Sequence, residues 1–100
     1  MSKSRLELHN VLKGFCDNVY FQPPETIKLK YPCIIYSRDK SYTKHANDKL
    51  YMHMKRYSIM IIDPDPDTEI PDMMIELPYC SFDRFYPADN LNHYIFNLYY

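Results

Sequence analysis

The sequence predicts one α+β domain: a mostly antiparallel β-sheet, two helices on one face of it and a projecting β-hairpin arm. An amphipathic helical pattern opens the chain, and short β-branched and aromatic segments follow it. Proline-rich or polar turn sequences separate these segments. The length of 100 residues suits a single domain over 1–100. The expected order of elements is α-β-β-β-α-β-β.

The first helix is predicted from a cap and an apolar stripe. Ser4 and Glu7 have the spacing of a capping box. Apolar residues then recur at helical spacing up to residues 14–16. They are Leu8, Val11, Leu12 and Phe15.

Three strands are expected in the first two-thirds of the chain. Residues 19–21 form a short apolar run, which Pro23 and Pro24 must end because proline cannot donate ladder hydrogen bonds. The β-branched and aromatic residues at 32–37 predict a core strand. A longer strand is expected over 50–62.

The segment 38–56 is predicted to form the projecting arm. It is polar and charged as far as residue 49, and it contains the turn-forming pair Asn47-Asp48. Residues 51–56, the beginning of the longer strand, are expected to lie in this projecting part. Hairpins join antiparallel neighbours, which favours an antiparallel sheet.

The last third of the chain predicts a helix and two strands. Prolines interrupt the acidic residues of 63–67, and 70–77 has the proline and acidic residues that suit a first helical turn. Residues 81–86 and 94–100 are expected to be strands, joined by the turn-rich sequence 87–90.

Composition argues against several function classes. The net charge of −1 gives no basic field of the kind that draws a protein onto nucleic acid. The single glycine, Gly14, leaves no glycine-rich phosphate loop. No stretch approaches the roughly 20 apolar residues of a membrane span, so no membrane partner is expected.

No catalytic residue, metal site or cofactor is predicted. Asp63, Asp65 and Asp67 are spaced somewhat like a calcium loop, but prolines stand between them and the glycine for the sharp bend is missing. The three cysteines have no CxxC spacing, and the four histidines have no i, i+4 spacing. A Cys80–His93 nucleophile pair stays open, because such partners meet in space.

Eleven tyrosines and no tryptophan indicate a surface that is half dry and half wet, which is typical of protein interfaces. We therefore expect the chain to assemble with other protein chains. The subunit contacts are assigned to the proline-bounded segment 20–25 and to the arm. The residues are Tyr20, Phe21, Pro23, Pro24, Tyr42, His45, Tyr51, Met52, Met54 and Arg56.

Three stretches carry a family resemblance: Asn18–Pro24, Lys30–Tyr36 and Cys80–Tyr86, supported by 88–91 and 96–98. With them, the chain resembles the small minor tail proteins of long-tailed bacteriophages described as tail terminators or tail-completion proteins. The likeness spans nearly the whole chain.

The resemblance implies a structural virion protein without enzymatic activity. Such a protein forms a homo-oligomeric ring, usually a hexamer, that caps the head-proximal end of the tail tube. Its partners would be the tail tube protein and the head–tail connector protein, with DNA passing through the lumen without specific binding. It would be assembled in the cytoplasm of the bacterial host. The alternatives are another connector or stopper ring protein, or a small nucleic-acid-binding module that uses the 38–57 hairpin.

Overall fold

The computed structural model describes residues 4–39 and 54–100, in the order α1-β1-β2-β3-α2-β4-β5. This is the order predicted from the sequence. The helices are α1 (Arg5–Lys13) and α2 (Ile70–Met74). The strands are β1 (Val19–Phe21), β2 (Cys33–Arg38), β3 (Arg56–Asp63), β4 (Cys80–Ala88) and β5 (Leu91–Tyr99).

The predicted cap begins α1. The Ser4 side chain accepts a hydrogen bond from the Glu7 amide at 3.1 Å, which satisfies one of the free amides of the first turn. Leu8 and Leu12, one turn apart, are fully buried. The local pattern therefore gives both the beginning of the helix and the face that it buries.

The five strands form one sheet in the order β1-β2-β3-β5-β4. The pairs β2–β3, β3–β5 and β4–β5 are antiparallel, and the short β1 is parallel to β2. This confirms the mostly antiparallel α+β fold. The chain passes through α2 between β3 and β4, and β5 then returns between them, so β4 lies at the edge of the sheet.

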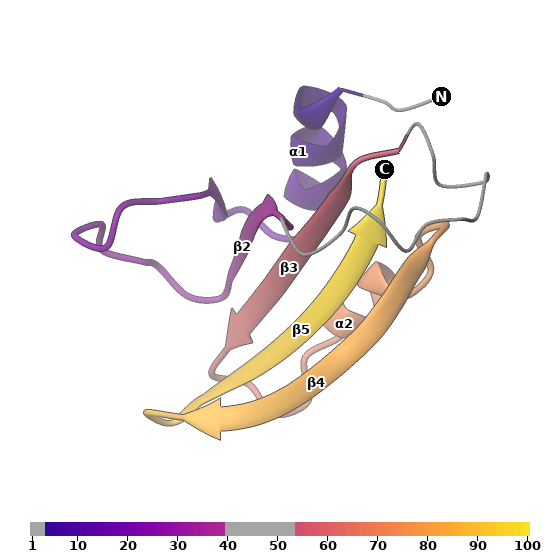
Figure 1. The fold of residues 1–100 in the computed structure, drawn as a ribbon. Helices are drawn as coiled ribbons and strands as arrows, with labels where there is room; N and C mark the ends of the chain where they lie inside the picture. Colours follow the sequence, from indigo (N-terminus) through magenta and orange to yellow (C-terminus); the bar gives the residue numbers. More distant parts are fainter. Residues whose placement is uncertain (1–3, 40–53) are drawn as a thin grey trace.

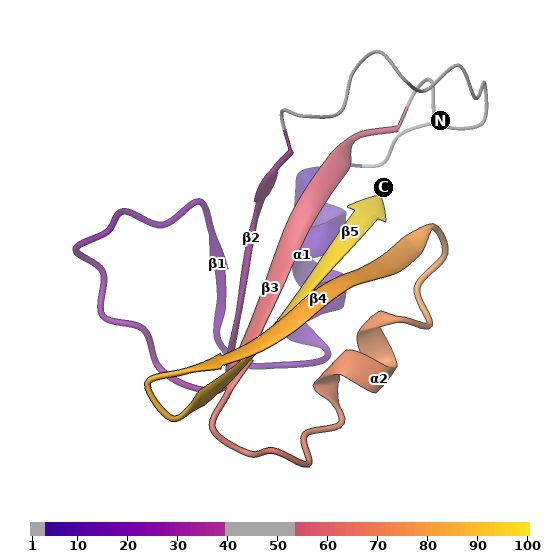
Figure 2. The ribbon, with the colours of Figure 1, turned by 60° about the horizontal axis from the view of Figure 1, so that its bottom comes forward.

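Both helices lie on the same face of the sheet, as predicted (Figures 1 and 2). Opposed pairs of apolar residues on the strands, such as Ile34–Ile61 and Ile59–Phe96, form the floor of the core. Leu12 from α1 and Met74 from α2 complete it, and both are fully buried. Among the described residues, no helix is long and apolar enough to cross a membrane.

Several boundaries differ from the prediction. Arg56 is the first residue of β3, opposite Tyr99 of β5, and is not part of a projecting arm. The helix predicted over 70–77 ends at Met74, and Leu77 continues it only as a hydrogen-bonded turn. The two last strands are longer than predicted, because Pro87 and Ala88 belong to β4 and the turn contains only Asp89 and Asn90.

The arm itself lies largely outside the described residues. Its described ends continue the sheet: the Asp39 amide bonds to the Arg56 carbonyl at 2.9 Å, and Lys55 and Tyr100 exchange backbone hydrogen bonds. β2 and β3 are thus antiparallel neighbours joined through the arm segment, as predicted.

Candidate assembly surface

β4, at the outer edge of the sheet, is the most exposed of the described strands. Every residue of 81–87 is exposed, although all of them belong to one regular strand. Phe82 is 53% exposed, Phe85 47% and Tyr86 37%. A long exposed edge strand with aromatic side chains offers both unpaired backbone groups and apolar area to another chain.

Each exposed aromatic ring of β4 lies against a ring of β5. Phe82 meets Phe96 with ring centroids 5.4 Å apart, and Phe85 meets Tyr94 at 4.9 Å. Tyr86 stacks on His93 at 4.7 Å, with only 8° between the planes. Each ring thus packs against β5 on one side and stays partly exposed on the other.

The residues predicted on β1 are less available than expected. The Tyr20 hydroxyl accepts a hydrogen bond from the Lys30 amide at 3.3 Å. Phe21 packs on Tyr36 with centroids 4.9 Å apart, and the Arg5 guanidinium lies 4.4 Å above its ring. Phe21 therefore belongs to the rim of the core.

The prolines and the described arm residues present more surface. Pro24 is exposed, while Pro23 and Met54 are half-buried. Arg56 Nε lies 3.2 Å from Asp39 Oδ2, an ion pair without hydrogen-bond alignment. The other predicted contact residues lie outside the described part of the chain. They are Tyr42, His45, Tyr51 and Met52.

No described helix covers the sheet face opposite α1 and α2 (Figure 1). This face carries an apolar row. Ile35, Met60 and Ile95 lie side by side across β2, β3 and β5. Ile35 and Met60 are half-buried, and Ile95 is 5% exposed. The adjacent row is polar, formed by Ser37, Ser58 and Asn97. This mixed face is the second candidate contact surface.

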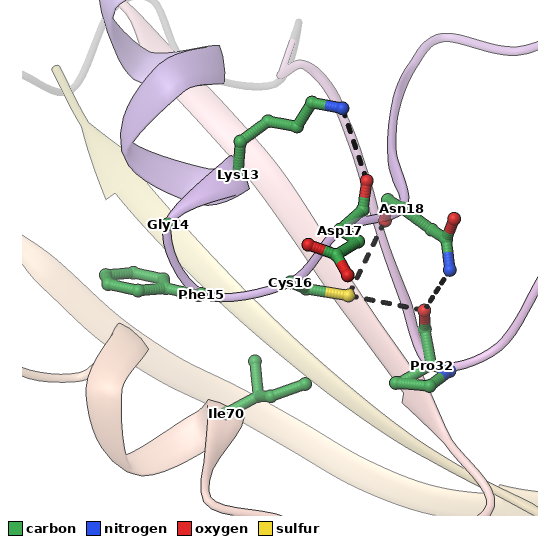
Figure 3. A pocket seen from close by; sticks show the side chains of 8 residues that line it. All are labelled: Lys13, Gly14, Phe15, Cys16, Asp17, Asn18, Pro32 and Ile70. Atoms are coloured by element: carbon green, nitrogen blue, oxygen red, sulfur yellow. Dashed lines mark hydrogen bonds between the residues drawn. The ribbon is translucent and has the colours of Figure 1, made fainter.

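A cavity of about 290 Å³ lies between the end of α1 and the beginning of α2 (Figure 3). Lys13, Cys16 and Asn18 donate side-chain hydrogen bonds to backbone carbonyls in the segments before β1 and β2. The Lys13 amine donates to the Asp17 carbonyl at 3.3 Å, and the Asn18 side chain donates to the Pro32 carbonyl at 3.1 Å. The cavity is lined by Lys13, Gly14, Phe15, Cys16, Asp17, Asn18, Pro32 and Ile70.

The cysteines are held as neutral thiols. Cys16 Sγ donates to the Pro32 carbonyl at 3.2 Å, and burial raises the pKa of this thiol. Burial raises the pKa of Cys33 to about 12 and that of Cys80 to about 11. A thiol attacks as its thiolate, so these environments disfavour a nucleophilic role.

The structure does not bring Cys80 and His93 together. Cys80 lies opposite Leu98 in the β4–β5 ladder, whereas His93 lies opposite Tyr86 at the far end. At roughly 3.4 Å per residue, five residues of β5 separate the two positions by about 17 Å. The nucleophile pair that the sequence left open is therefore not formed.

Two carboxylates of the acidic segment at the end of β3 accept hydrogen bonds from backbone amides of the same segment. Asp63 Oδ1 accepts the Asp65 amide at 2.8 Å, and Asp65 Oδ1 accepts the Asp67 amide at 2.9 Å. Successive turns of this kind explain why carboxylates occur at this spacing. In the part of the chain that the structure describes, no three potential metal ligands lie close together.

The two described arginines of the 38–57 hairpin lie against aromatic rings. The Arg38 guanidinium lies 5.7 Å from the centre of the Tyr57 ring, and that of Arg56 lies 5.8 Å from the Tyr99 ring. Arg56 is also paired with Asp39. They do not form the unpaired basic groove that a single strand of nucleic acid would need.

Comparison with known proteins finds no matching family model and no significant match among curated proteins or solved structures.

Sequence reasoning missed the β4 edge. Phe82, Phe85 and Tyr86 belong to the strand predicted over 81–86, but none is among the contact residues expected from the sequence. Their signal is weak, because the aromatic residues flank the charged pair Asp83-Arg84 and do not alternate with polar residues as in a half-buried strand.

Proposed function

We propose that this chain is a structural virion protein, a tail terminator that assembles into a ring of six subunits at the head-proximal end of a phage tail tube. The tail tube protein would bind one side of the ring and the head–tail connector protein the other. DNA would pass through the lumen without specific binding. The observation that carries the proposal is the exposed edge strand β4, with the aromatic residues Phe82, Phe85 and Tyr86.

That surface differs from the surface of an ordinary small monomer. Soluble monomers shorten, charge or cover their edge strands. Here the β4 edge presents three exposed aromatic residues on nine residues of regular strand. Ile35 and Met60, both half-buried, add a smaller apolar region on the face away from the helices. Both features favour a protein that binds other chains.

A closed ring needs two different patches on each subunit, because its contacts are head to tail. The exposed Pro24 lies just beyond β1 at one edge of the sheet, and the half-buried Met54 just before β3. The sheet face opposite the helices, with the half-buried Met60, is the second patch. The two patches consist of different residues, which is compatible with a head-to-tail contact.

The charges also support a lumen that DNA can pass. The chain has a net charge of −1. Its described arginines near the arm, Arg38 and Arg56, lie over tyrosine rings. Neither feature would hold the phosphate backbone strongly. A connector or stopper ring of the head–tail junction is the alternative within the same class, and the position of the protein in the virion separates the two.

The test compares the wild type with a Met60→Glu variant by sedimentation velocity. A carboxylate on the uncovered face would have to be desolvated in the ring contact, so Met60→Glu should shift the protein from rings to smaller species. Glu76→Lys, which changes an exposed residue after α2, should leave the rings intact. Circular dichroism checks that both variants are folded.

Two outcomes would reject the proposal. One is a wild-type protein that neither forms rings nor binds purified tail tubes. The other is DNA binding at about 0.15 M salt that falls when Lys44, Lys55 and Arg56 are all changed to alanine, which would favour the nucleic-acid-binding alternative.

A further inference from the structure

The sequence of β4 is complementary to itself. Its centre is the oppositely charged pair Asp83-Arg84, with Phe82 before it and Phe85 after it. Suppose that two copies of this strand run antiparallel with Asp83 opposite the second copy's Arg84. Arg84 then lies opposite the second copy's Asp83, so two charge pairs form. Phe82 then lies opposite the second copy's Phe85. One register thus matches opposite charges and aromatic rings together.

The faces of the sheet agree with this register. Phe82 is opposite Phe96, and Phe85 is opposite Tyr94, so both phenylalanines lie on the helix face. Between them β4 carries a β-bulge, whose two residues Asp83 and Arg84 oppose the single residue Ile95. Ile95 belongs to the uncovered face. The pairing therefore places the phenylalanines of the two copies together on the helix face and their charged residues together on the opposite face.

The backbone is also directed suitably. In an antiparallel ladder, pairs that exchange hydrogen bonds alternate with pairs whose amide and carbonyl groups point away. At one end of β4 the Tyr99 amide donates to the Tyr79 carbonyl at 3.2 Å. By alternation along the strand, the backbone amide and carbonyl of Phe82 then point away from β5, toward the outer edge. At the other end Ala88 pairs with Leu91 to close a two-residue turn, so the backbone groups of Ala88 point toward β5. By the same alternation, the backbone groups of Phe85 and Pro87 point outward. Phe82 and Phe85 can then exchange both backbone hydrogen bonds with a second copy.

A bulge, charged residues and a proline are also the devices by which proteins protect an edge strand from pairing. At β4 their arrangement argues against protection. The charges are of opposite sign and adjacent, so self-pairing neutralises them. Pro87 falls opposite the second copy's Cys80, near the end of the contact, where it removes only its own hydrogen bond. The short β1, which Pro23 and Pro24 follow, is the protected edge of this sheet.

We propose that β4 pairs with β4 of a second copy across a twofold axis, with Asp83 opposite Arg84, and so joins two five-stranded sheets. A twofold contact uses the same patch on both copies, whereas the contacts that close a ring use two different patches. The pairing is therefore separate from the proposed ring contact, and either can exist without the other.

A charge-swap series tests the register in the full-length chain. Asp83→Arg places arginine opposite arginine, and Arg84→Asp places aspartate opposite aspartate. Each single variant should associate with itself about tenfold more weakly than the wild type in sedimentation equilibrium. An equimolar mixture of the two variants should recover association, because each then meets its opposite charge. The double variant Asp83→Arg/Arg84→Asp should recover it alone.

Asp17→Arg and Lys28→Asp are the matched controls. They make the same changes of net charge at exposed positions away from β4, and they should leave association unchanged. Association that ignores the charge of residues 83 and 84 would overturn the proposal, and so would a mixture that fails to recover it. A wild-type protein whose only assemblies are rings insensitive to both swaps would also overturn it, while leaving the proposed function standing.

Discussion

Phe82 and Phe96 meet edge to face across β4 and β5, with ring planes inclined at 70°. Phe96 is 2% exposed, whereas Phe82 is 53% exposed. One aromatic contact thus joins a ring of the core to a ring of the surface. The core of the subunit ends between these two side chains, and the candidate assembly surface begins at Phe82.

The two phenylalanines should therefore differ sharply in their effect on stability. Phe96→Ala empties a buried site and should lower the free energy of unfolding by about 3–5 kcal/mol. Phe82→Ala removes a half-exposed ring and should cost about 1 kcal/mol in dilute protein. Urea unfolding of both variants measures the difference, and equal losses would show that Phe82 is a core residue.

The hydroxyl group of Tyr36 should contribute to the stability of the fold. This oxygen accepts from Arg5 at 3.1 Å and lies 2.7 Å from His9 Nδ1. Tyr36→Phe should lower the free energy of unfolding by about 1–2 kcal/mol. Tyr57→Phe is the matched control, because the buried Tyr57 hydroxyl has no hydrogen-bond partner among the described residues. That change should be neutral or slightly stabilising, and an equal loss in both variants would contradict the role of the network.

His9 should make stability depend on pH. Burial, with smaller contributions from the positive charges of Arg5 and Lys13, lowers the pKa of His9 below 6.5. Between this lowered pKa and the unfolded value near 6.5, the unfolded chain binds more protons, so stability falls as the pH falls. His9→Asn should flatten the slope of unfolding free energy between about pH 7 and pH 5. An unchanged slope would assign the dependence to other groups.

The β4–β5 turn offers a test of backbone strain. Asp89 and Asn90 have φ values of 55° and 62°, in the left-handed region, as a two-residue hairpin turn requires. Asn90→Ala should lower the free energy of unfolding by about 1 kcal/mol, because alanine tolerates this region poorly. Asn90→Gly should be nearly neutral. Thermal unfolding distinguishes them, and equal melting temperatures would contradict the account.

Local patterns predicted most of the elements. The Ser4 cap, the buried stripe of α1 and the short β1 ended by prolines depend on residues close in the chain. The order of elements and the antiparallel pairing also followed, since each prediction rests on a turn or a run of apolar residues.

The position of β4 at the edge could not be predicted in this way. It depends on β5 returning between β3 and β4, which is a long-range choice that no local pattern specifies. Phenylalanine is usually a core residue, so the sequence alone does not indicate that Phe82 and Phe85 are exposed. They are exposed because the strand order places β4 at the edge of the sheet. The packing of Phe21 could not be predicted for the same reason, because its neighbours Tyr36 and Arg5 are distant in sequence.

Assembly into a closed ring is the central claim, and electron microscopy of the purified wild-type protein in negative stain tests it most directly. The account predicts class averages of closed rings with sixfold symmetry that bind one end of isolated tail tubes. Single small particles at every concentration, with no binding to tail tubes, would contradict it.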